Sequence, residues 1–125
     1  MPRLSSQGWR FALVGAASTG LHVSVASSLI ELAGLHAGAA NGIAFTVATL
    51  ASYLLNSGWT FQARLAFARL VRFVVVALAG LAVTVEITSA IQRAGYHYLV
   101  GIAVVVIVVP VFTFFSHRMW TYRAS

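Results

Sequence analysis

Four long apolar stretches alternate with short polar or glycine-containing segments along the chain. They cover residues 11–32, 39–58, 73–91 and 99–116. At about 1.5 Å of rise per residue, helices of these lengths reach the roughly 30 Å that a bilayer core requires. Backbone polar groups in lipid must be bonded within their own segment, so each stretch is predicted to be a membrane-spanning helix.

The pattern occurs twice, about sixty residues apart. Three short matches appear in the same order in both halves: Arg10-Phe11 and Arg72-Phe73, Ala33-Gly34 and Ala94-Gly95, Trp59-Thr60 and Trp120-Thr121. Self-similarity at a fixed period indicates a repeated structural unit. Each half therefore holds two predicted spans.

The composition agrees with a membrane protein. Of all residues, 60% are hydrophobic and only 8% are charged, with a mean hydropathy of +0.90. A soluble domain carries about 25% charged residues, so this chain has too few to cover a surface that faces water. The net charge of +6 does not point to nucleic acid, because the arginines lie beside the apolar stretches and no nucleic-acid motif is present. The chain has no cysteine.

The arginines also predict the orientation. Seven of the eight lie in the N-terminal head, the central connection and the C-terminal tail, and only Arg93 lies on the other side. Positive residues are retained in the cytoplasm, so both termini and the central connection are expected there. The expected fold is all-α: an integral membrane four-helix bundle of two parallel two-helix repeats, forming one domain over residues 1–125.

Polar residues in the second and fourth stretches form a candidate substrate path. Thr49 and Asn56 lie on one helical face of the second stretch, and Ser52 is close by. Thr113 and His117 lie 61 residues after Ser52 and Asn56. Packing between helices is the alternative reading for the Thr residues, because small and polar side chains seek helix neighbours in lipid.

Two ionisable residues lie inside predicted spans. Glu86 is in the third stretch and His22 in the first. A carboxylate inside a membrane is costly and marks a functional hypothesis. Proton coupling, pairing of Glu86 with His22, and a neutral structural role all remain open. His36 and His97 lie in equivalent turns without a third ligand, so no metal site is predicted.

Arginines beside the spans are candidates for lipid-phosphate contacts, since the planar guanidinium suits phosphate. The candidates are Arg10, Arg64, Arg72 and Arg118. A purely topological role is the alternative for each. No catalytic constellation and no glycine-rich phosphate loop is present, so neither an enzyme nor a cofactor is predicted.

Several motifs together resemble the GtrA-like family of small four-helix membrane proteins. They are Arg10-Phe11-Ala12-Leu13-Val14-Gly15, Ala40-Asn41-Gly42-Ile43-Ala44-Phe45 and Asn56-Ser57-Gly58-Trp59-Thr60-Phe61, with Arg72-Phe73 and Trp120-Thr121-Tyr122 as repeats. The resemblance covers residues 10–123. Family members commonly have Asn or Asp where this chain has Ser18, His22, Ser52 and His117, whereas Asn56 is kept.

The resemblance implies translocation of a polyprenyl-phosphate-linked sugar, such as undecaprenyl-phosphate glucose, across the bacterial inner membrane for cell-surface polysaccharide synthesis or glycosylation. It also implies a membrane glycosyltransferase as a partner. Two other functions remain open: a small proton-coupled exporter of the small multidrug-resistance type, using Glu86, and a non-transporting subunit of a glycosyltransferase. Whether the chain acts alone or as a homo-oligomer is also open.

Overall fold

The computed structural model describes residues 3–123, apart from the surroundings of Gly38 and the side chain of Tyr98. These residues form four long helices and no strand, which confirms the predicted all-α membrane class. The chain divides into two compact units, Met1–Leu65 (unit 1) and Ala66–Ser125 (unit 2), so the boundary falls between the two sequence repeats. The ends of the predicted domain, residues 1–2 and 124–125, lie outside the described residues.

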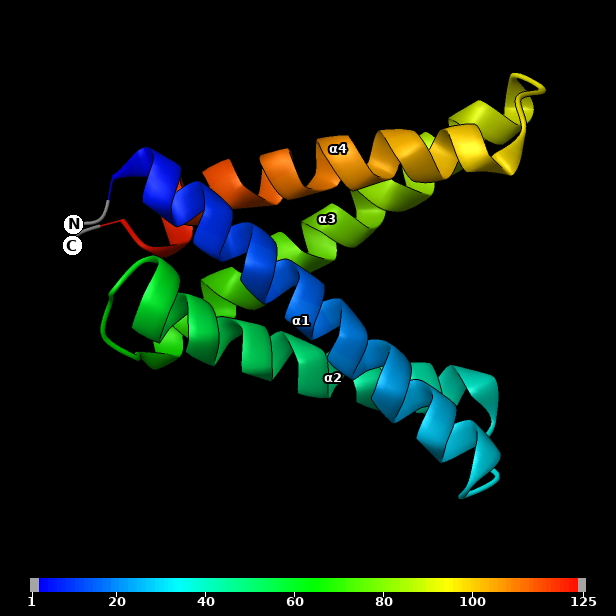
Figure 1. Ribbon diagram of the computed structural model, residues 1–125, viewed down its shortest axis with the longest axis horizontal. Coiled ribbons are helices and arrows are strands. Elements are labelled where there is room, and N and C mark those ends of the chain that lie inside the picture. Colours follow the sequence, from blue (N-terminus) through cyan, green and yellow to red (C-terminus); the bar gives the residue numbers. More distant parts are fainter. Residues whose placement is uncertain (1–2, 124–125) are drawn as a thin grey trace. The chain divides into compact units, whose positions relative to one another are not determined.

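Unit 1 is a helical hairpin. Helix α1 (Leu4–Glu31) packs along helix α2 (Ala37–Leu55), which continues into a π-helical turn, η1 (Asn56–Thr60) (Figure 1). Gly34 adopts a φ of 69° in the connection between α1 and α2. This left-handed conformation costs a glycine little, so Gly34 lets the chain reverse directly after α1.

A stripe of alanines lies along α2. Ala40, Ala44 and Ala48 recur every fourth residue and are buried, the first two completely. Small residues at this spacing let two helix backbones approach closely in a membrane, where apolar burial alone gives little drive for association. By contrast, Gly42 and Thr46 of α2 are exposed.

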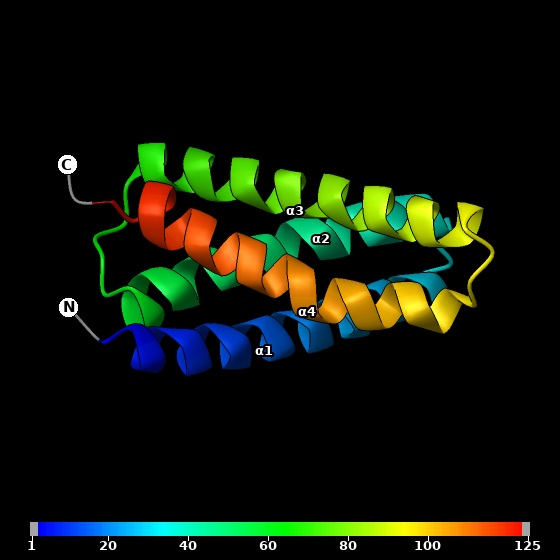
Figure 2. The same cartoon turned by 90° about the horizontal axis from the view of Figure 1, so that it is seen from above.

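Unit 2 repeats this architecture. Helix α3 (Phe67–Arg93) packs along helix α4 (Tyr98–Ser116), which continues into the π-helical turn η2 (His117–Thr121) (Figure 2). Gly95 has a φ of 83° and occupies the position equivalent to Gly34. The His97 side chain accepts a hydrogen bond from the backbone N–H of Leu99 at 3.2 Å and so caps the start of α4.

Helices α3 and α4 approach closely at Gly80. A Cβ added to Gly80 would lie 2.9 Å from Cγ2 of Thr113. The Thr113 hydroxyl donates to the carbonyl of Val109 at 3.0 Å, which fixes the rotamer that points the methyl group at α3. Thr113 was a candidate for a substrate path, and the structure gives it a packing contact within unit 2.

The helices are longer than some of the predicted spans. Helix α1 begins at Leu4 rather than at residue 11, and α3 begins at Phe67 rather than at residue 73. The prediction placed these boundaries where the apolar stretches begin, but residues 4–10 and 67–72 contain no proline and belong to the helices. Among the described residues, three helical segments are long and apolar enough to cross a membrane: Leu4–Glu31, Phe67–Arg93 and Leu99–Thr121.

Candidate functional site

Both units end in a wider helical turn at the Trp-Thr motif. The N–H of Phe61 donates to the carbonyl of Asn56 at 2.8 Å, and the N–H of Tyr122 donates to the carbonyl of His117 at 2.8 Å. These bonds join residues five apart, as in a π-helix, which occurs mostly as single turns and frequently at functional sites. The turn brings the motif into contact with Arg10 of α1 in unit 1 and with Arg72 of α3 in unit 2.

In unit 1, Arg10 is held by the two tryptophans beside it. Its Nη1 donates to the Trp59 carbonyl at 3.1 Å. Its guanidinium carbon lies 5.3 Å from the centroid of the Trp59 ring and 5.6 Å from that of Trp9. The two indoles meet edge to face at 5.3 Å. Cation–π attraction and a fixed hydrogen bond therefore orient the guanidinium at the η1 end of the hairpin.

In unit 2, Arg72 makes the equivalent contacts less tightly. Its Nη1 lies 3.5 Å from the Trp120 carbonyl, and its guanidinium carbon lies 5.9 Å from the centroid of the Trp120 ring. The neighbouring aromatic pair is also repeated: Phe11 meets Phe61 at 6.4 Å, and Phe73 meets Tyr122 at 6.4 Å. The repeat seen in the sequence is thus a repeat of side-chain contacts.

The two units differ one turn further inside. In unit 1, the Asn56 amide nitrogen donates to the Ser52 hydroxyl at 3.1 Å, so its carbonyl oxygen Oδ1 points elsewhere. That Oδ1 is buried without a hydrogen-bond partner, and so is Oγ1 of Thr60. Asn56 is 1% exposed and Thr60 is fully buried. Two polar atoms four residues apart are therefore buried here with unused hydrogen-bonding capacity.

In unit 2, the equivalent pair, His117 and Thr121, is closed by a hydrogen bond between the two side chains. Nδ1 of His117 lies 3.0 Å from Oγ1 of Thr121, at hydrogen-bond distance. The face of the imidazole stacks on Phe73, with ring centroids 4.2 Å apart and planes at 12°. His117 was a candidate for the substrate path, and its ring contacts Thr121 with one edge and Phe73 with one face, both within its own unit.

Buried polar atoms without partners are rare in native structures, where roughly 90% or more are satisfied. Among the described residues, four such side-chain atoms occur, and all lie in unit 1: Arg10 Nε, Ser18 Oγ, Asn56 Oδ1 and Thr60 Oγ1. We call Arg10, Asn56 and Thr60 the η1 cluster; Ser18 lies about two turns further along α1. The η1 cluster offers both donors and acceptors to a polar ligand.

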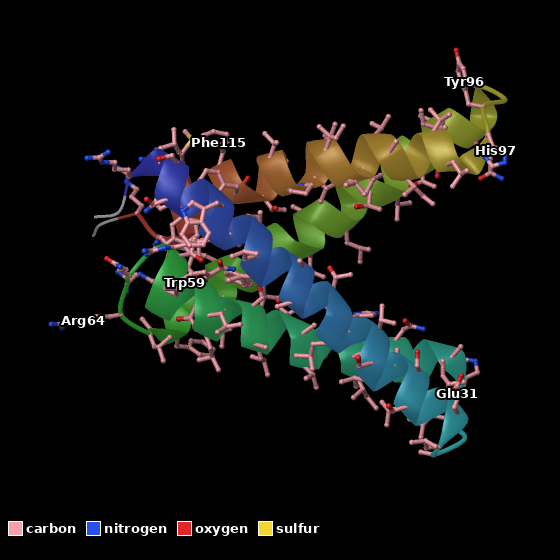
Figure 3. The ribbon with its side chains drawn as sticks, viewed as in Figure 1. Glu31, Trp59, Arg64, Tyr96, His97 and Phe115 are labelled. Atoms are coloured by element: carbon pink, nitrogen blue, oxygen red, sulfur yellow. The ribbon has the colours of Figure 1, made fainter. Side chains whose placement is uncertain are left out.

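The remaining candidates lie away from the η1 cluster or on the surface. His22 Nε2 lies 3.2 Å from Oδ1 of Asn41, so this histidine has a partner on α2. Thr49 is half-buried, and Glu86 is exposed on α3. Arg64 and Arg118 are exposed; Figure 3 shows Arg64 and Trp59 at the opposite end of unit 1 from Glu31.

The sequence interpretation missed two residues. Thr60 was read only as part of a boundary motif, although its position four residues after Asn56 could have identified it. Asn41 was read only as part of a family motif, yet it contacts His22. Among the described residues, no group of three His, Cys, Asp or Glu side chains could hold a metal ion.

The GtrA/DPMS transmembrane-domain model matches residues 10–122, which is most of the chain. No curated protein matches the chain. The family match covers Arg10, Arg72, both glycine turns and both π-helical ends. The chain is therefore a multi-pass membrane protein that belongs to the GtrA/DPMS transmembrane-domain family, a family of lipid-linked sugar flippases.

Proposed function

We propose that the chain translocates a polyprenyl-phosphate-linked sugar across the bacterial inner membrane, for polysaccharide synthesis or glycosylation at the cell surface. The observation that carries the proposal is the η1 cluster: the Arg10 guanidinium is hydrogen-bonded to the η1 turn, and two polar atoms of that turn are buried without partners. Leaving a buried polar atom unsatisfied costs about 1–3 kcal/mol. A ligand that satisfies these atoms would recover that free energy on binding.

The chemistry of the η1 cluster matches the two parts of such a headgroup. The guanidinium of Arg10 presents N–H donors in one plane, which suits phosphate oxygens. Asn56 Oδ1 accepts a hydrogen bond, and Thr60 Oγ1 both accepts and donates one, which suits sugar hydroxyl groups. In this proposal Arg10 binds the phosphate, while Asn56 and Thr60 bind the sugar.

The sequence predicted a substrate path formed by residues of both repeats, whereas this proposal assigns the headgroup to one unit. Unit 1 binds the headgroup, whereas the closed pair of His117 and Thr121 in unit 2 serves packing. Arg64 and Arg118, both exposed, would collect the anionic lipid by long-range attraction rather than by a fixed contact.

The test is reconstitution of the full chain in phosphatidylcholine vesicles that carry undecaprenyl-phosphate glucose. Flipping is measured as the rate at which the glucose becomes accessible to periodate added outside the vesicles. We expect faster exposure than in protein-free vesicles and a slower rate for Asn56→Leu. If no polyprenyl-phosphate sugar is flipped faster than in protein-free vesicles, the proposal is wrong. Co-purification with a glycosyltransferase would then favour a non-transporting subunit.

A further inference from the structure

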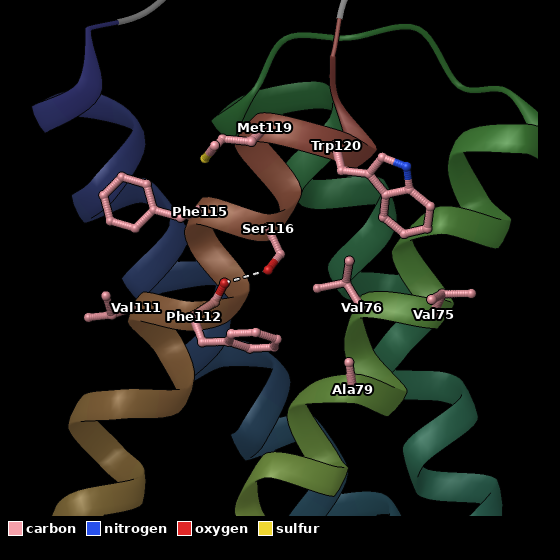
Figure 4. Close-up of a pocket in the computed structure, with 9 residues that line it drawn as sticks. All are labelled: Val75, Val76, Ala79, Val111, Phe112, Phe115, Ser116, Met119 and Trp120. Carbon is pink, nitrogen blue, oxygen red and sulfur yellow. Dashed lines mark hydrogen bonds between the residues drawn. The ribbon is translucent and has the colours of Figure 1, made fainter.

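Unit 2 contains an apolar groove that the proposed headgroup site does not use. It has a volume of about 510 Å³ and lies between α3 and the end of α4 with η2 (Figure 4). Val75, Val76 and Ala79 line it from α3, while Phe112 and Trp120 are among the residues on the other side. In Figure 4, the Trp120 ring lies over Val75 and Val76, and the Phe112 ring points towards α3.

The groove is apolar over its whole length. Besides the indole N–H of Trp120 at its end, its one polar lining side chain is Ser116, whose hydroxyl donates to the carbonyl of Phe112 at 2.8 Å. The side chains along the groove therefore offer a ligand dispersion contacts and no polar recognition until the position of Trp120.

The guanidinium of Arg72 lies at the Trp120 end of the groove. Arg72 precedes Val75, Val76 and Ala79 by three, four and seven residues, a spacing that places all four on one face of α3. Its guanidinium lies over the Trp120 ring, 5.9 Å from the centroid, and Nη1 is 3.5 Å from the Trp120 carbonyl. Among the described residues this is its one hydrogen bond, so most of the five donors of Arg72 remain available.

We propose that this groove binds the isoprenoid chain of a polyprenyl phosphate, with the phosphate bound by Arg72. The inference rests on the proposed function and adds a second site for the lipid, in unit 2, to the headgroup site at Arg10 in unit 1. A prenyl phosphate has its charge directly at the end of an unbroken hydrocarbon chain. That order of chemistry matches a groove that is apolar up to a guanidinium.

A glycerophospholipid matches the groove less well. Its phosphate is separated from its two chains by glycerol and ester groups, so polar carbonyls would occupy an apolar part of the groove. Burying such groups without donors is unfavourable. Apolar surface alone cannot select a ligand in a membrane, because lipid chains are as apolar as the side chains of the groove. Selection between these lipids therefore depends on the phosphate and on whether other polar groups lie between it and the hydrocarbon chain.

Photolabelling of the full chain in phosphatidylcholine vesicles tests the proposal. The probe is farnesyl phosphate with a diazirine at the far end of its chain, compared with the corresponding farnesol and with phosphatidylcholine that carries a diazirine on an acyl chain. Mass spectrometry locates the label. We expect the phosphate probe to label peptides containing Val76, Ala79 or Val111 more strongly than either comparison probe.

Two variants and a control make the test specific. Ala79→Trp fills the groove and should lower labelling by about tenfold, as expected when the contacts of a few methylene groups are lost. Ala82→Trp makes the same change at an exposed position of α3 and should leave labelling within about twofold. Arg72→Gln should lower labelling by farnesyl phosphate and leave labelling by farnesol unchanged.

The outcomes separate this inference from the proposed function. Equal labelling of the groove by all three probes would mean that bulk lipid occupies it, and labelling unaffected by Ala79→Trp would mean that the chain binds elsewhere; either result overturns the inference. Neither result concerns flipping. Conversely, groove labelling with the expected pattern in a protein that flips no sugar would support the lipid site and reject translocation.

Discussion

Nδ1 of His117 lies 3.0 Å from Oγ1 of Thr121, whereas the equivalent atoms of unit 1, on Asn56 and Thr60, are buried without partners. The two pairs lie 61 residues apart, at equivalent positions of the π-helical turns η1 and η2. The repeated backbone therefore carries one satisfied pair and one unsatisfied pair. Natural proteins accept local instability where a ligand binds, which makes stability measurements informative here.

Thr60→Val and Thr121→Val should have different effects on stability. Thr121→Val removes a buried hydrogen bond to His117 and should lower the free energy of unfolding by about 1–3 kcal/mol. Thr60→Val removes an oxygen that has no partner, so stability should stay equal or rise by up to about 1 kcal/mol. Thermal unfolding of both variants in the same detergent measures the difference. Equal losses in both variants would show that Thr60 has a structural partner.

Arg10→Lys should slow flipping about tenfold or more, as expected for the loss of a charge-assisted hydrogen bond. Lysine keeps the charge but cannot hold the Trp59 carbonyl and present a planar set of donors to phosphate at the same time. Arg3→Lys is the control, since Arg3 is exposed and its side chain caps no helix. The vesicle assay gives both rates. An unchanged rate in Arg10→Lys would exclude Arg10 as the phosphate ligand.

Gly80→Ala should destabilise unit 2 by about 1–3 kcal/mol through overpacking, because the added Cβ would lie 2.9 Å from Cγ2 of Thr113. Adding Thr113→Ser removes that methyl group and should restore most of the loss. Gly20→Ala is the control, because a Cβ there meets no atom within 4 Å. Thermal unfolding of the wild type, Gly80→Ala, the double variant and Gly20→Ala measures these changes in stability. A double variant no more stable than Gly80→Ala alone would assign the loss to another cause.

Glu86→Gln should leave the rate of flipping unchanged, with or without a pH gradient across the vesicle. Glu86 is exposed on α3, whereas the atoms of the η1 cluster belong to unit 1. The measurement is the periodate assay at two external pH values. A large loss of transport, together with loss of its dependence on the gradient, would favour the proton-coupled exporter over the lipid-sugar flippase.

Much of the fold was predictable because it depends on local features. Gly34 and Gly95 indicated the turns because glycine readily adopts a positive φ. Arg10 and Arg72 indicated equivalent positions in the two units because each begins a matching motif. The alanine stripe on α2 was not recognised, because alanine in an apolar stretch gives no contrast in hydrophobicity. Close helix contact depends on size rather than polarity, and the hydrophobic pattern does not report size.

The site was harder to predict than the fold. Asn56 was identified from its place in the repeat, but the sequence does not show which of its amide atoms is bonded. Which amide atom is bonded depends on the π-helical turn, because the turn sets the directions in which the side chains of Asn56 and Thr60 point. Similarly, Trp59 was recognised only as part of a repeated motif, while its carbonyl and its ring both bind Arg10. Such contacts arise from three-dimensional geometry and leave little trace in residue type.

The hairpin architecture has a consequence for how the protein is made. Helix α1 packs on α2, the next helix in the chain, and α3 packs on α4, so these contacts join segments close in sequence. Local contacts form quickly because little chain entropy is lost in closing a short connection. The first hairpin can therefore acquire its packing while the second is still being synthesised, and its contacts need no segment that has yet to leave the ribosome.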